Sequence, residues 1–373
     1  MRAIFSDEIV KKYVDFWNFK NEGPLVGVSY ESENYKSPES LGLVKPWMEG
    51  DAGWIFARAV SRANKIGDMS PVADALDIME NEILNNTCYA GAAYPIANMN
   101  TGAGCLAAFI TGYENFYGDT VWFELEKPWD YEKILALPKD HATNFAKVSV
   151  EAVRMAAERF KGRALLTLLD LGGLADVLSS LRRTDGFLYD MIDKPDEVKK
   201  SLRVVHEIWK NYYYQLQKIT GEANAGLCTS WTAILSDTPY YPSQCDACAL
   251  ISPEMFKEFI APTLNDEFAL FDKTIYHLDG SGEIAHLGMM CENPSLKVIQ
   301  WVPEPTVGHA DASYIPLYKS IIEHGRKIIF DGFRGEFDEL VNLMKILPGG
   351  AFFLHLWAEN KNQAEEWLDR LQK

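Results

Sequence analysis

The sequence has no long apolar run, few cysteines for its length and no cluster of basic residues. No uninterrupted apolar run reaches the ~18 residues that a membrane-spanning helix needs, so we expect no membrane partner. The first residues carry acidic side chains and no continuous apolar segment, which argues against a signal peptide. Six cysteines in 373 residues do not resemble a disulfide framework, so we expect reduced thiols and a cytoplasmic protein.

The charge balance excludes a further class of partner. Lysine and arginine together number 36, against 53 aspartates and glutamates, which gives a net charge of −17. A chain of this charge without a basic patch repels the phosphate backbone of nucleic acids. We therefore expect a small-molecule substrate and no nucleic acid.

The glycine fingerprints of nucleotide-binding folds are also missing, because none follows an early strand-like run. Short apolar runs rich in β-branched and aromatic residues instead alternate with amphipathic stretches of helical spacing. In the second half of the chain, the strand-like runs are "KTIYHLDG", "LKVIQWVPE", "KIIFDGF" and "AFFLHLWAE". We predict that these four runs are consecutive parallel strands.

Earlier runs extend the same alternation. The strand-like ones are "GPLVGVSYE", "AAYPIANMN", "RALLTLLDLGG" and "YYPSQCDACAL", with "DTVWFEL" as an accessory strand. About eight strand–helix units in ~250 residues are typical of a closed (β/α)8 barrel. We predict one barrel domain over residues 1–373, with residues 1–25 and 40–90 as N-terminal helical additions.

Catalytic groups of such barrels lie at the C-terminal ends of the strands. Side chains alternate along a strand, so His277 and Asp279 share a face, as do His355 and Trp357. The alternative is that the Asp-Gly pairs of these runs only end strands as turns. The polar residues at the predicted strand ends are Asp170, Asp246, His277, Asp279, Gln300, Asp331 and His355.

Aromatic residues lie near the same strand ends and indicate a type of ligand. Aromatic faces beside carboxylates suit a flat apolar ring or a methylated cation. The alternative is that the tryptophans fill the interface between helices and strands. The residues concerned are Tyr30, Trp122, Trp231, Trp301 and Trp357, with Glu124, Asp237 and Asp246 as the carboxylates.

Several blocks of the chain resemble the uroporphyrinogen decarboxylase-like superfamily. They are "EKPWDYEKILALP", "AERFKGRALLTLLDLGGLADVLSSL", "DGFLYDMIDKPDEVKKSLRVVHEIW" and "ISPEMFKEFIAP", and the resemblance covers most of residues 120–373. It implies a (β/α)8 barrel. It also implies one of two activities, the decarboxylation of porphyrinogens or zinc-dependent methyl transfer involving corrinoid proteins.

The chain departs from both branches of that superfamily. The arginine-rich segment that holds the substrate carboxylates of the decarboxylases corresponds to "GPLVGVSYESENY", which has no arginine, so uroporphyrinogen is not expected as substrate. The methyltransferases hold zinc through His-x-Cys and a later cysteine. Here Asp279 stands two residues after His277, and no cysteine follows Cys291. The resemblance therefore implies a partly retained zinc site with His277 and Asp279 as ligands.

The pair Cys245 and Cys248 forms a single CxxC, which binds zinc or cycles as a dithiol in other proteins. Without a second pair the motif is weakly specific. We expect Asp246 to point into the barrel mouth and both cysteines to pack in the interior.

These observations predict an enzyme in which His277, Asp279 and Asp246 are catalytic. The first hypothesis is methyl transfer or demethylation of a small aromatic or methylated amine compound, with a corrinoid protein or folate as methyl partner. The second is a decarboxylase-type lyase acting on a small carboxylate, and the third is a ligand-binding barrel without catalysis. A homodimer is left open. The expected substrate contacts are Tyr30, Trp122, Trp231, Gln300, Trp301, Asp331, His355 and Trp357.

Overall fold

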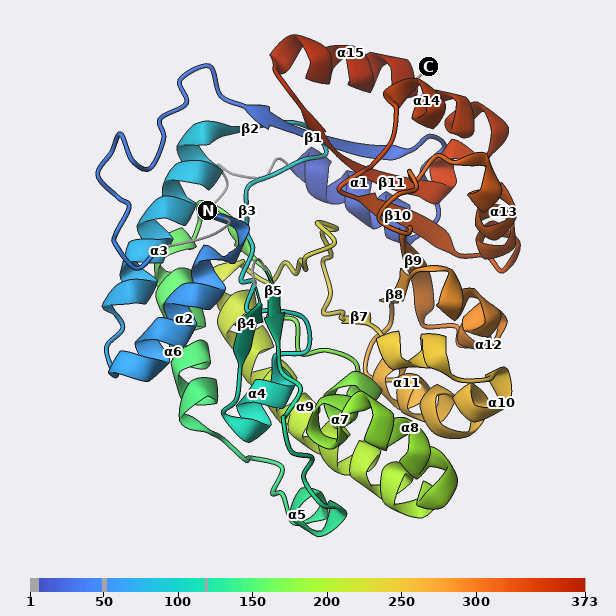
Figure 1. The fold of residues 1–373 in the computed structure, drawn as a ribbon. Coiled ribbons are helices and arrows are strands. Elements are labelled where there is room, and N and C mark those ends of the chain that lie inside the picture. The colour runs from blue at the N-terminus through green and yellow to red at the C-terminus, as the bar shows by residue number, and fades with distance from the viewer. Residues whose placement is uncertain (1–6, 49–51, 118–119, 373) are drawn as a thin grey trace.

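The structure, a computed structural model, describes residues 7–48, 52–117 and 120–372, and it is a mixed α/β protein (Figure 1). Its largest sheet has seven strands in the order β2-β1-β11-β10-β9-β8-β7. Apart from β2, which is antiparallel to β1, neighbouring strands in this sheet are parallel. The strands are β1 (Leu25–Glu31), β2 (Thr87–Gly91), β7 (Pro242–Ser243), β8 (Thr274–Asp279), β9 (Leu296–Val302), β10 (Lys327–Asp331) and β11 (Phe352–Ala358).

The four strands predicted in the second half of the chain are confirmed. They are β8, β9, β10 and β11, each parallel to the next. The register sets His277 opposite Gln300 and Asp331 opposite His355. Because parallel strands end at the same edge, the polar residues that end these strands gather on one side of the sheet.

The earlier strands are shorter than the sequence suggests. β3 (Ile96–Ala97) and β6 (Leu165–Leu166) form a separate parallel pair. The run "YYPSQCDACAL" contributes only the two residues of β7 and then turns into a 3-10 helix, Asp246–Leu250. The accessory strand is found in part, as β5 (Thr120–Trp122), which pairs antiparallel with β4 (Asn115–Tyr117). The ladders among the described residues do not by themselves close a barrel.

The helices lie around the outside of the strands (Figure 1). Ser252 caps α10 by accepting the backbone N–H of Met255, as the Ser-Pro pair predicts. Among the described helices, none has the length and apolar character that crossing a membrane requires. The helices are α1 (Asp7–Trp17), α2 (Ile55–Ile66), α3 (Ser70–Asn81), α4 (Leu106–Thr111), α5 (Tyr131–Leu135), α6 (Asn144–Phe160), α7 (Leu174–Arg182), α8 (Thr184–Asp193), α9 (Pro195–Ala223), α10 (Pro253–Met255), α11 (Ala261–Phe268), α12 (Leu287–Met290), α13 (Ile315–Glu323), α14 (Phe337–Ile346) and α15 (Lys361–Gln372).

Helix α1 covers the N-terminal ends of the strands. Its aromatic residues Tyr13, Phe16 and Trp17 are buried in one apolar cluster with strand residues such as Ile275 and Phe353. The rings of Tyr13 and Phe353 meet edge to face, with centroids 5.5 Å apart. Since α1 closes this end, any site built from strand-end side chains lies at the opposite, C-terminal end.

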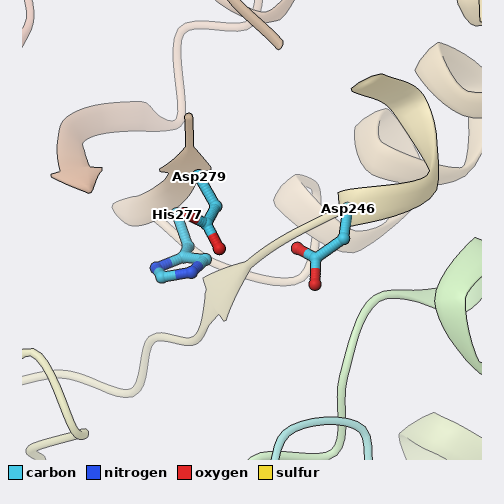
Figure 2. Close-up of side chains that lie close together, drawn as sticks. All are labelled: Asp246, His277 and Asp279. Carbon is cyan, nitrogen blue, oxygen red and sulfur yellow. The ribbon is translucent and has the colours of Figure 1, made fainter. Parts of the chain in front are cut away.

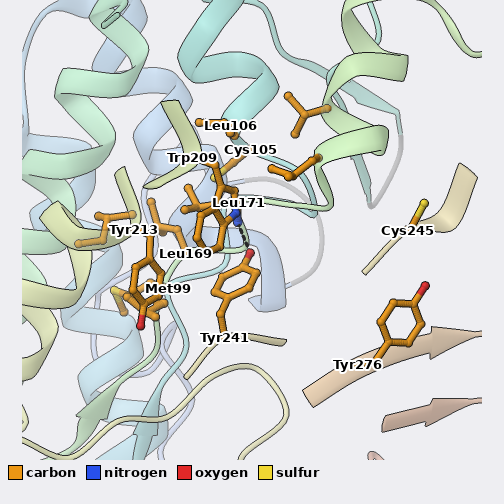
Figure 3. Close-up of a cluster of buried hydrophobic side chains, with 14 of the residues drawn as sticks. Met99, Cys105, Leu106, Leu169, Leu171, Trp209, Tyr213, Tyr241, Cys245 and Tyr276 are labelled. Atoms are coloured by element: carbon orange, nitrogen blue, oxygen red, sulfur yellow. Dashed lines mark hydrogen bonds between the residues drawn. The ribbon is translucent and has the colours of Figure 1, made fainter. Parts of the chain in front are cut away.

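An aromatic cluster joins α9 to the strands (Figure 3). The ring of Trp209 stacks on Tyr213 at 5.1 Å and meets Tyr241 edge-on at 5.0 Å. The hydroxyl of Tyr241 accepts the backbone N–H of Leu171 at 2.8 Å. This buried contact holds the segment that follows β6, and with it the neighbouring Asp170, against β7.

A buried carboxyl group in α11 makes the stability of the protein depend on pH. Glu267 is 1% exposed, and burial raises its pKa to about 8. The folded state therefore keeps this proton at a pH where the unfolded chain has lost it, so stability falls as pH rises from about 4.5 to about 8. Glu267→Gln is expected to make this decline shallower by up to about 1.4 kcal/mol per pH unit. Urea unfolding across this pH range measures the slope, with the exposed Glu158→Gln as control. Equal slopes for both variants would contradict the prediction.

Candidate functional site

Three predicted catalytic residues lie together at the C-terminal ends of β7 and β8. Asp246 follows β7 as the first residue of the short 3-10 helix, and His277 and Asp279 lie at the end of β8. One possible ligand atom from each lies within 4.8 Å of the other two. Figure 2 shows the three side chains directed toward a common space. The pairing of β7 with β8 explains this approach, because it brings the two strand ends side by side.

The two glycines after Asp279 fit the turn that ends β8. Gly280 has a φ of 80°, a conformation that side chains other than hydrogen disfavour. A Cβ atom on Gly282 would lie 2.9 Å from the Cβ of Ala249. The stretch "YHLDGSG" is therefore both a turn and part of the cluster, so the two interpretations do not exclude each other.

The orientation of His277 is set by Gln300. Nδ1 of His277 lies 2.7 Å from Oε1 of Gln300 on the adjacent strand β9. Since an amide oxygen only accepts, Nδ1 carries the proton and donates it, which leaves the lone pair on Nε2. The ring of Trp231 also meets His277 nearly edge-on, with centroids 6.4 Å apart. Gln300 and Trp231, both predicted as substrate contacts, thus lie next to the cluster.

Asp170 adds a buried carboxyl group beside these residues. Its Oδ1 accepts hydrogen bonds from the backbone N–H of Gly172 at 2.9 Å and from Nε2 of Gln244 at 3.1 Å. Burial is the largest influence on this carboxyl and raises its pKa to about 6, against the opposing effect of His277. Asp170 is one of the polar residues at the predicted strand ends, and the structure places it near His277.

Sequence reasoning missed Asp176, in the first turn of α7. Its carboxylate accepts the backbone N–H groups of Asp246 and Ala247 at 3.1 and 2.9 Å. Burial, followed by the charge of Asp246, raises the pKa of Asp176 to about 8. Asp176 therefore anchors the backbone from which Asp246 projects. An aspartate in a first helical turn is common, so the sequence carried no specific signal for this role.

A cavity of about 340 Å³ opens beside Asp246. Trp122, the last residue of β5, and Glu124, two residues later, both line it. Oε2 of Glu124 accepts the hydroxyl of Thr184 at 2.9 Å, which holds the carboxylate at the wall. Among the described residues that line the cavity, none is an arginine or a lysine. The cavity therefore combines an aromatic surface with acidic groups.

Two of the predicted substrate contacts point away from this cluster. Trp301 is fully buried and packs its ring against Tyr314, because it faces the side of β9 opposite to Gln300. Tyr30 follows Ser29 on β1 and lies near Lys361 and Glu365 of α15. The structure therefore does not bring Trp301 or Tyr30 to the cavity.

Asp331, His355 and Trp357 form a separate group at the ends of β10 and β11. Nδ1 of His355 lies 3.0 Å from Oδ1 of Asp331. Trp357 is 61% exposed and lines a second cavity of about 610 Å³. Strand β9 separates this group from the strand of His277 in the sheet, so the sequence predicted one site where the structure has two groups.

The cysteines of the CxxC pair do not reach the cluster as thiolates. Cys245 and Cys248 are buried, and all six cysteines are free. A hydrogen bond with Cys248, reinforced by burial, raises the pKa of Cys245 well above its usual range. The thiol of Cys245 therefore stays protonated, and both side chains pack in the interior, as expected for the pair.

The donor set at Asp246, His277 and Asp279 fits a divalent cation. The two carboxylates are hard ligands and the imidazole nitrogen is a borderline one, and Gln300 supports the imidazole as ligating histidines require. The set lacks the thiolates implied by the resemblance to zinc-dependent methyltransferases. It is therefore a possible metal site that does not identify zinc.

Comparison with models of protein families finds none that matches the chain, and comparison with curated proteins finds no similar sequence. The function must therefore be argued from the site itself.

Proposed function

We propose that this protein is a metal-dependent demethylase that removes a methyl group from a small methylated aromatic or amine compound. One observation carries the proposal: Asp246, which forms the cluster with His277 and Asp279, also lines a cavity that presents Trp122 and Glu124. The cluster supplies hard ligands and acid–base groups, and the cavity supplies a surface for a methylated cation or aromatic ring.

The proposed scaffold is a closed (β/α)8 barrel of the uroporphyrinogen decarboxylase-like superfamily. Its first strand, β1, is parallel to its last strand, β11, as closure requires. The parallel pair β3 and β6 would complete the ring between β1 and β7. The cluster would then lie at the C-terminal mouth, where the active sites of such barrels are found.

Demethylation breaks the bond between the methyl carbon and a nitrogen or oxygen atom. The methyl group passes to a nucleophilic acceptor, and the bonding electron pair stays on the heteroatom. An ether oxygen or an uncharged amine nitrogen gains a proton in this step, whereas a quaternary ammonium leaves as a neutral amine. Asp170 is the proposed proton donor, since its buried carboxyl group keeps a proton at higher pH than an exposed aspartate does. A divalent ion held by Asp246, His277 and Asp279 would act as a Lewis acid toward the heteroatom. The acceptor is proposed to be a reduced corrinoid or a folate.

The test is methyl transfer from a panel of methylated amines and aryl methyl ethers to free cob(I)alamin, followed by the absorbance of methylcobalamin. Turnover of at least one compound is expected.

Trp122→Ala and Glu124→Gln should weaken binding of a quaternary ammonium ligand about tenfold, which corresponds to one lost cation–π contact or charge. Calorimetry measures the dissociation constant of this ligand, with the distant Trp367→Ala as control.

Uroporphyrinogen should neither bind nor react, because the cavity wall among the described residues has no cationic side chain.

Decarboxylation of a small carboxylate is the second candidate. It is favoured by Asp246, which lines the cavity and whose pKa is raised above the usual aspartate value by burial. A protonated carboxyl group could deliver a proton to the carbanion that forms when CO2 leaves. Release of CO2 without formation of methylcobalamin would replace the demethylase proposal with this one.

A further inference from the structure

Three residues on adjacent parallel strands form a hydrogen-bonded chain at the C-terminal end of the sheet. Ser29 lies on β1, His355 on β11 and Asp331 on β10. Nδ1 of His355 is 3.0 Å from Oδ1 of Asp331, and Nε2 of the same ring is 3.4 Å from Oγ of Ser29. This order of serine, histidine and aspartate is the one in which an imidazole acts as a base at Nε2.

We propose that these residues form a second acid–base centre, in which His355 removes a proton from a hydroxyl, amine or thiol group of a small molecule. In this step the lone pair on Nε2 takes the proton, and the electron pair of the broken bond stays on the small molecule as a nucleophile. The imidazolium that forms is stabilised by the carboxylate of Asp331. The proposal goes beyond the proposed function and does not depend on it.

Asp331 is the positioning residue of this centre. A carboxylate accepts hydrogen bonds, so it favours the neutral imidazole that carries its proton on Nδ1. The opposite tautomer would set the lone pair of Nδ1 against the oxygen of Asp331 at 3.0 Å. The pair thus keeps the lone pair of His355 on Nε2, where a base needs it.

The position of Ser29 argues against a role as a covalent nucleophile. Its side chain is 3% exposed, and its strand is paired on both sides, with β11 and with β2. A buried serine in a central strand has neither room for an adduct nor a free backbone donor for an oxyanion. At 3.4 Å its hydroxyl is a weak partner for Nε2, so the lone pair of that nitrogen stays available to another proton donor.

A small molecule can reach the other two members. The side chains of His355 and Asp331 are 26% and 22% exposed. Asp331 on β10 is two strand spacings, or about 10 Å along the sheet, from the strand of His277, and His355 on β11 is three spacings, or about 14 Å, from it. The centre therefore acts on a different group from the one held at the metal cluster.

The tautomer of His355 tests the proposal without any substrate. Long-range proton–nitrogen spectra of protein labelled with 15N-histidine, recorded at alkaline pH, distinguish the two ring nitrogens, and His355→Gln assigns the signals. The wild-type ring should carry its proton on Nδ1. Asp331→Ala should shift it toward the Nε2–H form, whereas Ser29→Ala and the exposed control Asp266→Asn should leave it unchanged. A wild-type Nε2–H ring, or no change in Asp331→Ala, would overturn the proposal.

Acylation by diethyl pyrocarbonate gives a second, chemical readout, because this reagent attacks an unprotonated imidazole nitrogen. His355 should be modified in native protein, at least about tenfold more slowly in Asp331→Ala and faster in Ser29→Ala. Site-resolved mass spectrometry measures the rates, with the exposed His324 as internal reference. If His355 stays unmodified while His324 reacts, the nitrogen is not accessible and the proposed base is wrong.

Discussion

Replacing His277 with alanine is expected to abolish tight metal binding and to lower demethylation at least about 10²-fold. The imidazole supplies the single nitrogen donor of the cluster, and Gln300 holds its Nδ1 at 2.7 Å so that Nε2 faces the two carboxylates. Asp246→Asn and Asp279→Asn should each weaken metal binding as well, because each removes one anionic ligand of similar size. Metal content after purification without chelator, followed by titration of the metal-free protein, measures the loss.

His324→Ala is the matched control, because His324 is exposed at the C-terminal end of α13 and lies outside the cluster. Thermal unfolding should change little for His277→Ala, since a polar side chain at a strand end contributes mainly to function. If His277→Ala kept both its metal and its turnover, the stretch "YHLDGSG" would be a turn alone and the site assignment wrong. Lost activity with full metal content would instead assign His277 to the substrate.

The strands of the second half were predictable because their runs of β-branched and aromatic residues are long and separated by clear helical stretches. Alternation along "TIYHLDG" then sufficed to set His277 and Asp279 on one face. The first-half strands β3 and β6 have only two paired residues each, so their pattern is weak and their partners could not be read from the sequence.

The arrangement of the site depended on contacts that no local pattern encodes. Asp170 and Asp176 meet Asp246 only after β7 and α7 have packed together, so their proximity is a tertiary feature. At Trp301 the local pattern instead predicted a substrate contact that the structure does not bring to the cavity. Its position beside Gln300 near a strand end suggested a ligand contact, yet one step along β9 turns a side chain from the mouth to the helix layer.

The same tertiary packing makes Asp170 the most informative single substitution for the chemistry. Asp170→Asn is expected to slow demethylation of compounds with a basic leaving group by about 10²- to 10⁴-fold, the contribution typical of a positioned general acid. Asparagine keeps an oxygen that can accept the hydrogen bonds of Gly172 and Gln244, so the fold and the metal cluster should be retained. Metal titration of the variant checks this second point.

The pH dependence separates proton donation by Asp170 from a structural role. Burial raises the pKa of Asp170 to about 6, and a general acid acts only while it is protonated. Wild-type turnover should therefore fall as rising pH removes the proton of Asp170, and the profile of Asp170→Asn should be flat over the same range. A methyl ether of an acidic phenol provides the internal control, because its leaving group departs without a proton. For that compound the variant should lose little activity. Equal losses for basic and acidic leaving groups would show that Asp170 shapes the site without donating a proton.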